Sequence, residues 1–200
     1  MLIKICGITS IDTAKTVESA GADLIGFVFA PSKRKISPDQ AKEITRELSP
    51  RIKKVGVFVN ESIENIVEIA NIVGLDYIQL HGDEDESFAK QLPFPIIKAF
   101  TIDKTDIQTI EQYPADFILL DSPGKKYRGG TGETFNWEKI NETNLDKRKI
   151  ILAGGLNADN VQQAMKIVSP RGIDVSSGVE TDGKKDPEKI MKFIKRAREL

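Results

Sequence analysis

The chain has 200 residues, of which 40% are hydrophobic and 30% are charged, and its formal net charge of −1 gives no reason to expect nucleic acid or an anionic membrane as a partner. One cysteine and one histidine exclude an intramolecular disulfide and a zinc site built from thiolates and imidazoles. No long apolar segment at the N-terminus marks a signal peptide or a membrane span, so we expect a cytoplasmic protein.

Short apolar runs alternate along the chain with segments in which apolar residues have helical spacing. The first run, Leu2–Ile5, leads through Cys6 to Gly7, and the helix that follows it ends at Gly21. The runs predicted to be strands are 2–5, 24–29, 55–59, 77–80, 96–99, 117–120, 150–153 and 172–175. The segments predicted to be helices are 11–20, 38–48, 63–73, 83–92, 105–112, 137–140, 159–168 and 187–200.

Eight strand–helix units in 200 residues are close to the lower size limit of a (β/α)₈ barrel. A doubly wound open sheet would show the same alternation. Two details favour the barrel: polar residues recur at strand ends throughout the chain, and the glycine-rich turns come last. The predicted fold is therefore a single-domain α/β protein, a (β/α)₈ TIM barrel with short loops that spans residues 1–200.

Two turns late in the chain resemble a phosphate site. Gly154-Gly155 follows the seventh strand and Ser176-Ser177-Gly178 follows the eighth, the two positions where such barrels often bind phosphate. Exposed backbone N–H groups and serine hydroxyls can converge there on an anion. Alternatively, the glycines only end strands and the serines only cap helices. Lys184 and Lys185 either add positive charge to the site or are solvated.

The segment Gly178–Lys184 has the spacing of a nucleotide-binding P-loop. Residue 185 is a lysine where the magnesium-binding Ser or Thr of that motif belongs. We therefore interpret the match as accidental.

Three residues at strand ends are candidates for acid–base chemistry. Alternation of side chains along strands directs Cys6, His81 and Asp121 into the mouth of the barrel. Asp121 ends an apolar strand, where the protonated form of a carboxyl group is favoured, so it either acts as a general acid or caps its loop. Cys6 would need nearby cations to become a base. A histidine before a glycine is more often structural than catalytic.

Charged residues near the strand ends suggest two further contacts. Lys4 and Asp174 lie on the first and eighth strands, which are neighbours in a closed barrel, and we expect them to form a buried ion pair. The cluster Ser32-Lys33-Arg34-Lys35 is either a solvated loop or a carboxylate site in which Arg34 forms the fork.

Motifs that run in order from residue 3 to residue 186 resemble those of the phosphoribosylanthranilate isomerases. These motifs are Lys4-Ile5-Cys6-Gly7-Ile8-Thr9, Gly26-Phe27-Val28-Phe29 with Ser32-Lys33-Arg34, Val57-Phe58-Val59-Asn60, Gln79-Leu80-His81-Gly82, Leu119-Leu120-Asp121, Gly129-Gly130-Thr131-Gly132 with Phe135 and Trp137, Ala153-Gly154-Gly155-Leu156, and Asp174-Val175-Ser176-Ser177-Gly178-Val179-Glu180. One departure is Asp182, which stands where the family often has proline.

The resemblance implies a barrel that performs a cofactor-free and metal-free Amadori rearrangement in tryptophan biosynthesis. It implies that Asp121 is the general acid, that Cys6 is the general base and that Arg34 binds the anthranilate carboxylate. The loops 154–155 and 176–178 would bind the phosphate, and Gln79 and His81 are expected to line the substrate site. The expected partner is a phosphoribosyl substrate, bound by a monomer or a homodimer.

Three other interpretations compete with this one. A sugar-phosphate isomerase of histidine biosynthesis would use a pair of aspartates, whereas the first strand here ends in Cys6. Indole-glycerol-phosphate synthase would need a lysine–glutamate set and a longer N-terminus. A non-catalytic subunit that binds phosphorylated metabolites would not need Cys6 and Asp121.

Overall fold

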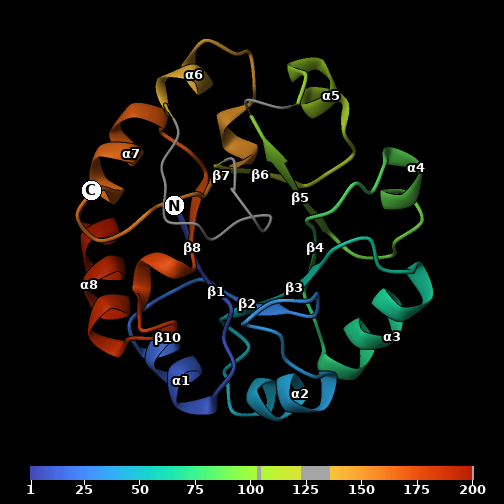
Figure 1. The fold of residues 1–200 in the computed structure, drawn as a ribbon, viewed down its shortest axis with the longest axis vertical. Helices are drawn as coiled ribbons and strands as arrows, with labels where there is room; N and C mark the ends of the chain where they lie inside the picture. Colours follow the sequence, from blue (N-terminus) through green and yellow to red (C-terminus); the bar gives the residue numbers. More distant parts are fainter. Residues whose placement is uncertain (103–104, 123–135, 200) are drawn as a thin grey trace.

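The protein is a closed barrel of eight parallel strands surrounded by helices (Figure 1). The computed structural model describes residues 1–102, 105–122 and 136–199. Each strand pairs with its neighbours in the sequence, and β1 pairs with β8 to close the ring. The strands are β1 (Leu2–Cys6), β2 (Leu24–Val28), β3 (Lys53–Phe58), β4 (Tyr77–Leu80), β5 (Ile96–Thr101), β6 (Phe117–Asp121), β7 (Ile150–Leu152) and β8 (Gly172–Val175). The predicted TIM barrel is confirmed.

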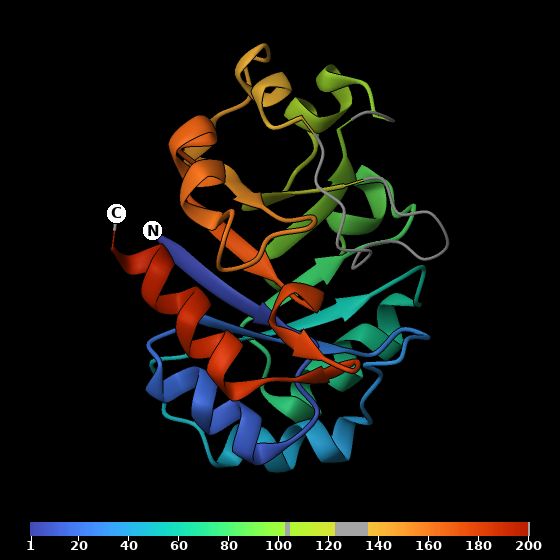
Figure 2. The same ribbon diagram turned by 60° about the vertical axis from the view of Figure 1, so that its left-hand side comes forward.

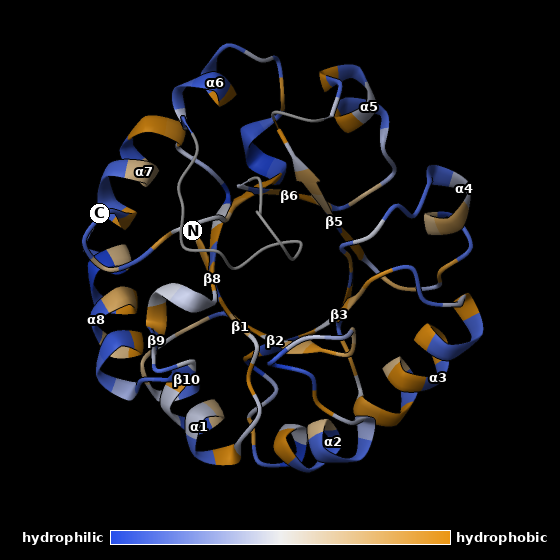
Figure 3. Ribbon diagram, viewed as in Figure 1, coloured by the Kyte–Doolittle hydropathy of each residue, from blue (hydrophilic) through white to orange (hydrophobic). Residues whose placement is uncertain are grey.

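Helices form the outer layer (Figure 2). Their buried apolar residues pack in the cluster between helices and strands (Figure 3). They are α1 (Ile11–Ser19), α2 (Pro38–Arg46), α3 (Ile63–Val73), α4 (Glu86–Ala89), α5 (Ile107–Gln112), α6 (Glu138–Asn141), α7 (Val161–Val168) and α8 (Pro187–Arg198), with 3₁₀ turns η1 (Lys147–Lys149) and η2 (Ser177–Val179). Among the described helices, none combines the length and the apolar character that a membrane span requires.

The predicted helix 83–92 is much shorter in the structure, because α4 begins only after Asp85. The carboxylate of Asp85 accepts a hydrogen bond from the N–H of Phe88 and so caps the helix. Glu84, one residue earlier, turns its side chain into the protein and is only 7% exposed. The residues before α4 therefore form a loop with buried polar contacts.

Two hydrophobic clusters hold the barrel together. The larger one lies between the strands and the helices, and the smaller one fills the barrel itself. The buried members of the inner cluster are Leu24, Val55, Ile97, Ala99, Leu119, Ile151 and Ala153. Leu2 of β1 and Tyr77 of β4 pack against this cluster. Side chains alternate along a strand, so Cys6, Gln79 and Asp121, at the same parity as Leu2, Tyr77 and Leu119, also point into the barrel.

After η2 the chain forms a small hairpin, in agreement with the interpretation of the P-loop spacing as accidental. Strands β9 (Glu180–Thr181) and β10 (Lys184–Lys185) pair in antiparallel fashion, with Lys185 opposite Glu180. The two turn residues, Asp182 and Gly183, have φ values of +52° and +75°. This is the geometry of a type I′ turn, for which Asp-Gly is a preferred sequence. Proline cannot adopt a positive φ, so this turn excludes proline at residue 182.

Candidate active site

The carboxyl ends of the strands meet at one mouth of the barrel, and the predicted site residues surround it. Cys6 ends β1, His81 directly follows β4 and Asp121 ends β6. The loops after β7 and β8 carry Gly154-Gly155 and Ser176-Ser177-Gly178. The motif residues Gly129-Gly130-Thr131-Gly132 and Phe135 lie outside the described part of the chain.

Cys6 lies beside a buried ion pair on neighbouring strands. The Nζ atom of Lys4 is 3.0 Å from Oδ1 of Asp174, and the side chain of Lys4 is fully buried. The predicted ion pair is therefore confirmed. Burial has the largest single effect and lowers the pKa of Lys4, but Asp174 and Cys6 together outweigh it and raise that pKa above its ordinary value. A permanent positive charge thus lies beneath the thiol.

Gly26 makes room for this arrangement. It pairs with Cys6 across β1 and β2, and a Cβ atom at this position would lie 2.8 Å from Sγ of Cys6 and 3.2 Å from Nζ of Lys4. Any side chain would therefore displace the thiol. The sequence motif contains Gly26, but only the packing of the two strands reveals this function.

The thiol of Cys6 is protonated in the resting protein. Burial raises its pKa, and Lys4 and Lys185 oppose that effect without overcoming it. Nearby cations are one way to lower the pKa of a cysteine. The cations are present, but desolvation of a thiolate at this depth has the larger effect.

Arg34 forms a bidentate ion pair with Glu180. Its Nε and Nη2 atoms donate to the two carboxylate oxygens at 2.7 and 2.9 Å. The stem of Arg34 crosses over Gly7, where φ is +81° and a Cβ atom would collide with the Arg34 Cδ. Arg34 therefore lies beside Cys6 at the mouth, and its Nη1 donates to no other described residue. That guanidinium edge remains available for an anion.

Lys185 connects the hairpin to the loop after β8. Its Nζ donates to the carbonyl and the hydroxyl of Ser176 at 2.8 and 3.2 Å and to Glu180 at 2.6 Å. Ser176 in turn donates its hydroxyl to the carbonyl of Cys6 at 3.1 Å. Burial lowers the pKa of Lys185, although the contact with Glu180 opposes this effect. Lys185 is thus a buried cation, whereas Lys184 is exposed.

Glu180 binds both Arg34 and Lys185. The sequence motifs did not predict this role. Burial raises the pKa of Glu180, but hydrogen bonds from Arg34 and Lys185 outweigh it and lower that pKa. Glu180 is therefore ionised at neutral pH. The only sequence signal was its place at the end of the last family motif.

The loops after β7 and β8 touch through their backbones. A Cβ atom on Gly178 would overlap the carbonyl oxygen of Leu156, so only glycine permits this contact. Gly154 and Gly155 have φ values of +81° and +64°, which favour glycine as well. The N–H groups of Gly155 and Leu156 donate to no other described residue. The two loops thus form one surface of backbone atoms, on which the N–H groups of Gly155 and Leu156 can donate to a ligand.

On the other side of the mouth, Asp121 contacts His81. One carboxylate oxygen of Asp121 accepts the N–H of Ser122 at 2.7 Å, so Asp121 does cap its own loop. The other oxygen lies 3.7 Å from Nε2 of His81. Nδ1 of His81 is 3.0 Å from Nε2 of Gln79, a nearly fully buried side chain on β4. Gln79, His81 and Asp121 therefore form one continuous chain of polar groups.

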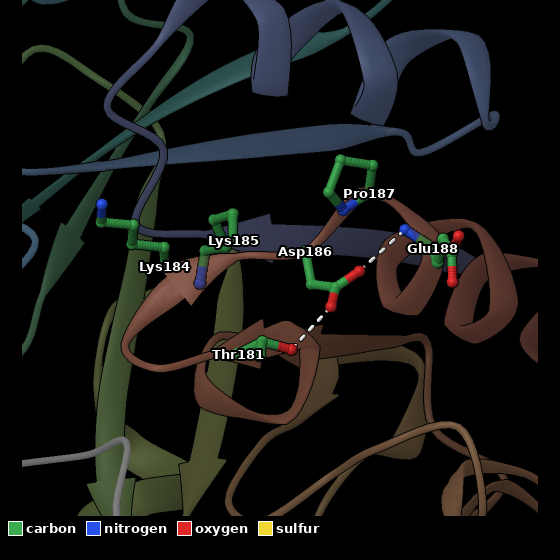
Figure 4. Close-up of a pocket in the computed structure, with 6 residues that line it drawn as sticks. All are labelled: Thr181, Lys184, Lys185, Asp186, Pro187 and Glu188. Atoms are coloured by element: carbon green, nitrogen blue, oxygen red, sulfur yellow. Dashed lines mark hydrogen bonds between the residues drawn. The ribbon is translucent and has the colours of Figure 1, made fainter.

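An open hollow between the hairpin and α8 is separate from these groups. Its lining residues are Thr181, Lys184, Lys185, Asp186, Pro187 and Glu188. Figure 4 shows Asp186 bound to the Thr181 hydroxyl and the Glu188 N–H, as expected of a residue that caps α8. Of the residues discussed above, only Lys184 and Lys185 line this hollow, and Lys185 directs its ammonium toward Ser176.

The closed parallel barrel, with a thiol and a carboxyl group at the carboxyl ends of its strands, defines a (β/α)₈-barrel enzyme. The family model described as N-(5′-phosphoribosyl)anthranilate isomerase matches residues 3–196. The chain therefore belongs to this family of aldose–ketose isomerases of tryptophan biosynthesis.

Individual relatives agree with the family model. The isomerase of Oceanobacillus iheyensis is 54% identical over 195 residues, which cover 97% of this chain and 95% of that protein. A phosphoribosyl anthranilate isomerase crystallised with reduced 1-(o-carboxyphenylamino)-1-deoxyribulose 5-phosphate is 39% identical, with a TM-score of 0.85 and 100% of both chains covered. Monomers generated from the dimeric isomerase of Thermotoga maritima give 39% identity and a TM-score of 0.84, again over 100% of both chains.

Proposed function

We propose that the chain converts N-(5′-phosphoribosyl)anthranilate into 1-(2-carboxyphenylamino)-1-deoxyribulose 5-phosphate in the cytoplasm, with Asp121 as general acid and Cys6 as general base. The observation that carries the assignment of roles is the placement of one carboxyl group and one buried thiol on different strands around the same mouth. An acid and a base on different strands can act on different atoms of one substrate.

Asp121 donates a proton to the ring oxygen of the sugar. The C1′–O bond breaks as the anthranilate nitrogen forms a Schiff base with C1′. The carboxyl group lies at the end of a buried strand, and its second oxygen is tied to the N–H of Ser122, so the donating oxygen has a fixed direction. Such positioned proton transfer typically accelerates a reaction by about 10²- to 10⁴-fold.

Cys6 removes the proton from C2′ and leaves an enolamine, which becomes the ketone when C1′ gains a proton and the C2′ hydroxyl loses one. The base form is the thiolate. Lys4 and Lys185 favour that form by their positive charge, while burial disfavours it. The number of protons on substrate and protein together is unchanged over the cycle.

Two anionic groups of the substrate match two cationic or donor-rich regions. Arg34 would bind the anthranilate carboxylate through Nη1 while Glu180 holds the rest of its guanidinium. The joined loops 154–156 and 176–178 would bind the phosphate through backbone N–H groups and the serine hydroxyls. The relative crystallised with a reduced phosphoribulose product supports a ligand of this chemistry.

The test is turnover of freshly prepared phosphoribosylanthranilate, followed by the loss of its fluorescence. We expect the wild type to turn over and both Cys6→Ala and Asp121→Asn to lose about 10²-fold or more in kcat. Retained turnover in Cys6→Ala would assign the base elsewhere, with His81 the next candidate. A wild type that binds the substrate without turnover would indicate a binding subunit.

A further inference from the structure

We propose that Gln79 holds the neutral ring of His81 in the tautomer that carries its proton on Nε2, so that His81 presents an N–H, and never a lone pair, to Asp121. The role of Asp121 in this inference rests on the proposed function. Gln79 is thus a positioning residue that acts through His81.

Gln79 contacts the ring of His81 through its side-chain amide. The Nε2 atom of Gln79 lies 3.0 Å from Nδ1 of His81. An amide nitrogen only donates, so Nδ1 has to accept, and a neutral imidazole that accepts at Nδ1 carries its proton at Nε2. Nε2 is the atom that faces Oδ2 of Asp121.

The burial of Gln79 favours one orientation of its amide. Among the described groups, Oε1 of Gln79 has no hydrogen-bond partner, and the side chain is 1% exposed. Turning the amide over would place Oε1 against Nδ1 and put the nitrogen, with its two N–H donors, in the unpartnered position. As placed, Oε1 and the second N–H make no hydrogen bond with a described group; turned over, both N–H groups would lack acceptors. A buried N–H without an acceptor is rarer in proteins than a buried carbonyl oxygen without a donor. The orientation in which Gln79 donates to His81 is therefore favoured.

The backbone around His81 is held firmly enough to keep this alignment. The His81 N–H donates to the carbonyl of Phe58 at 2.9 Å, and the Gly82 N–H donates to Glu84 at 2.9 Å. Buried Lys98 bridges the Gly82 carbonyl and the Glu84 carboxylate, each at 2.8 Å. The ring is thus fixed from its backbone as well as from Gln79.

The chemical consequence concerns the acidic proton of Asp121. A lone pair at Nε2 would accept that proton and compete with the substrate for it. An N–H at Nε2 cannot accept a proton, and it favours the carboxylate that remains after the proton has moved to the sugar. The present 3.7 Å separation is longer than a hydrogen bond, and contacts of this kind commonly shorten when substrate binds.

The test uses the fact that His81 is the only histidine of the chain. With ¹⁵N-labelled histidine, the two ring nitrogens give one set of signals, which report the tautomer directly at a pH of about 8.5, above the usual range of imidazole titration. We expect the Nε2–H form in the wild type and, because Gln79 sets it, also in Asp121→Asn. An Nδ1–H form in the wild type would overturn the proposal whether or not the protein is active.

Two variants separate Gln79 from Asp121 as the cause. In Gln79→Glu a carboxylate can only accept, so we expect the proton to move to Nδ1 and kcat to fall about tenfold or more, with a much smaller change in KM. In Gln79→Leu the preference should be lost and both tautomers should appear. Gln112→Glu adds the same charge on an exposed helix position and is the matched control. Two outcomes would contradict the proposal. One is a folded Gln79→Leu variant that keeps the Nε2–H tautomer alone, and the other is loss of the Nε2–H tautomer in Asp121→Asn but not in the Gln79 variants.

Discussion

At the scale of single residues, the site depends on a buried thiol whose environment works against its ionisation. Cys6 lies beside the fully buried Lys4 and pairs across the sheet with Gly26 of β2, which has no side chain. Burial raises the pKa of Cys6 more than Lys4 lowers it. The thiolate fraction should therefore limit activity at neutral pH.

This pKa predicts opposite trends for activity and stability as the pH rises. The base form of Cys6 increases with pH, so kcat/KM should increase from pH 7 toward pH 9. The pKa of Cys6 is higher in the folded protein than in the unfolded chain, so Cys6 contributes to stability as long as its thiol is protonated. This contribution is complete below the pKa of the unfolded thiol, about 8.5. It is lost as the pH rises through the folded-state pKa. Denaturant unfolding from pH 7 to 10 should show a steeper loss of stability for the wild type than for Cys6→Ala. If stability fell equally steeply with pH in the wild type and in Cys6→Ala, the raised pKa of Cys6 would be contradicted.

Gly26→Ala is predicted to damage the chemistry more than the fold. The new methyl group would lie 2.8 Å from Sγ of Cys6 and displace the thiol. We expect kcat to fall at least about tenfold and the alkylation rate of the single thiol to change. Gly56→Ala is the control, because its methyl group would meet Leu75, Phe58 and Phe29 and not the site. A Gly26→Ala variant with wild-type kcat would show that the thiol does not need this position.

At the scale of elements, the β9–β10 hairpin sets the positions of both Glu180 and Lys185. The hairpin register places these residues opposite each other. Glu180 then reaches across to Arg34, which belongs to the loop before α2. A short two-stranded element thus connects the loops after β2 and β8 at the mouth.

The hairpin predicts contrasting effects of two substitutions at Asp182. Proline cannot adopt the φ of +52° found there, so Asp182→Pro should disrupt the turn, destabilise the protein by about 1–3 kcal/mol and raise KM. Asparagine tolerates this conformation, so Asp182→Asn should behave like the wild type. Thermal unfolding and steady-state kinetics measure both effects. An unchanged KM in Asp182→Pro would mean that the turn does not position Arg34.

At the scale of the whole molecule, closure of the barrel brings the first and last strands together. Lys4 and Asp174 are 170 residues apart in the sequence and become register partners across β1 and β8. Near the chain ends, Arg198 at the end of α8 donates to the carbonyl of Met1. The ion pair and this contact both depend on closure.

Lys4→Met should therefore cost about 3–5 kcal/mol of unfolding free energy, because it leaves the buried carboxylate of Asp174 without its partner. Lys15→Met, which breaks the exposed ion pair with Glu47, is the control and should change stability little. Urea unfolding of both variants and the wild type makes the comparison. Equal stability of Lys4→Met and the wild type would show that the pair contributes nothing to closure.

The sequence by itself determined the order of strands and helices and the residues at the strand ends. Both follow from local periodicity, from turn-forming glycines or from the alternation of side chains along a strand. The sequence favoured the barrel over an open sheet, and the pairing of β1 with β8 decided between them. Helix ends were less predictable: Asp85 caps α4 late, because Glu84 is used in a buried contact with Lys98.

Only the tertiary structure decided what surrounds each candidate residue. Three contacts depend on distances between strands or loops. Glu180 binds Arg34 and Lys185, Gly26 leaves room for Cys6, and Gln79 donates to His81. The pKa of Cys6 is the clearest case. The sequence indicated that Cys6 would need nearby cations to become a base, but the effect of Lys4 and Lys185 against burial depends on depth and distance, which local patterns do not contain.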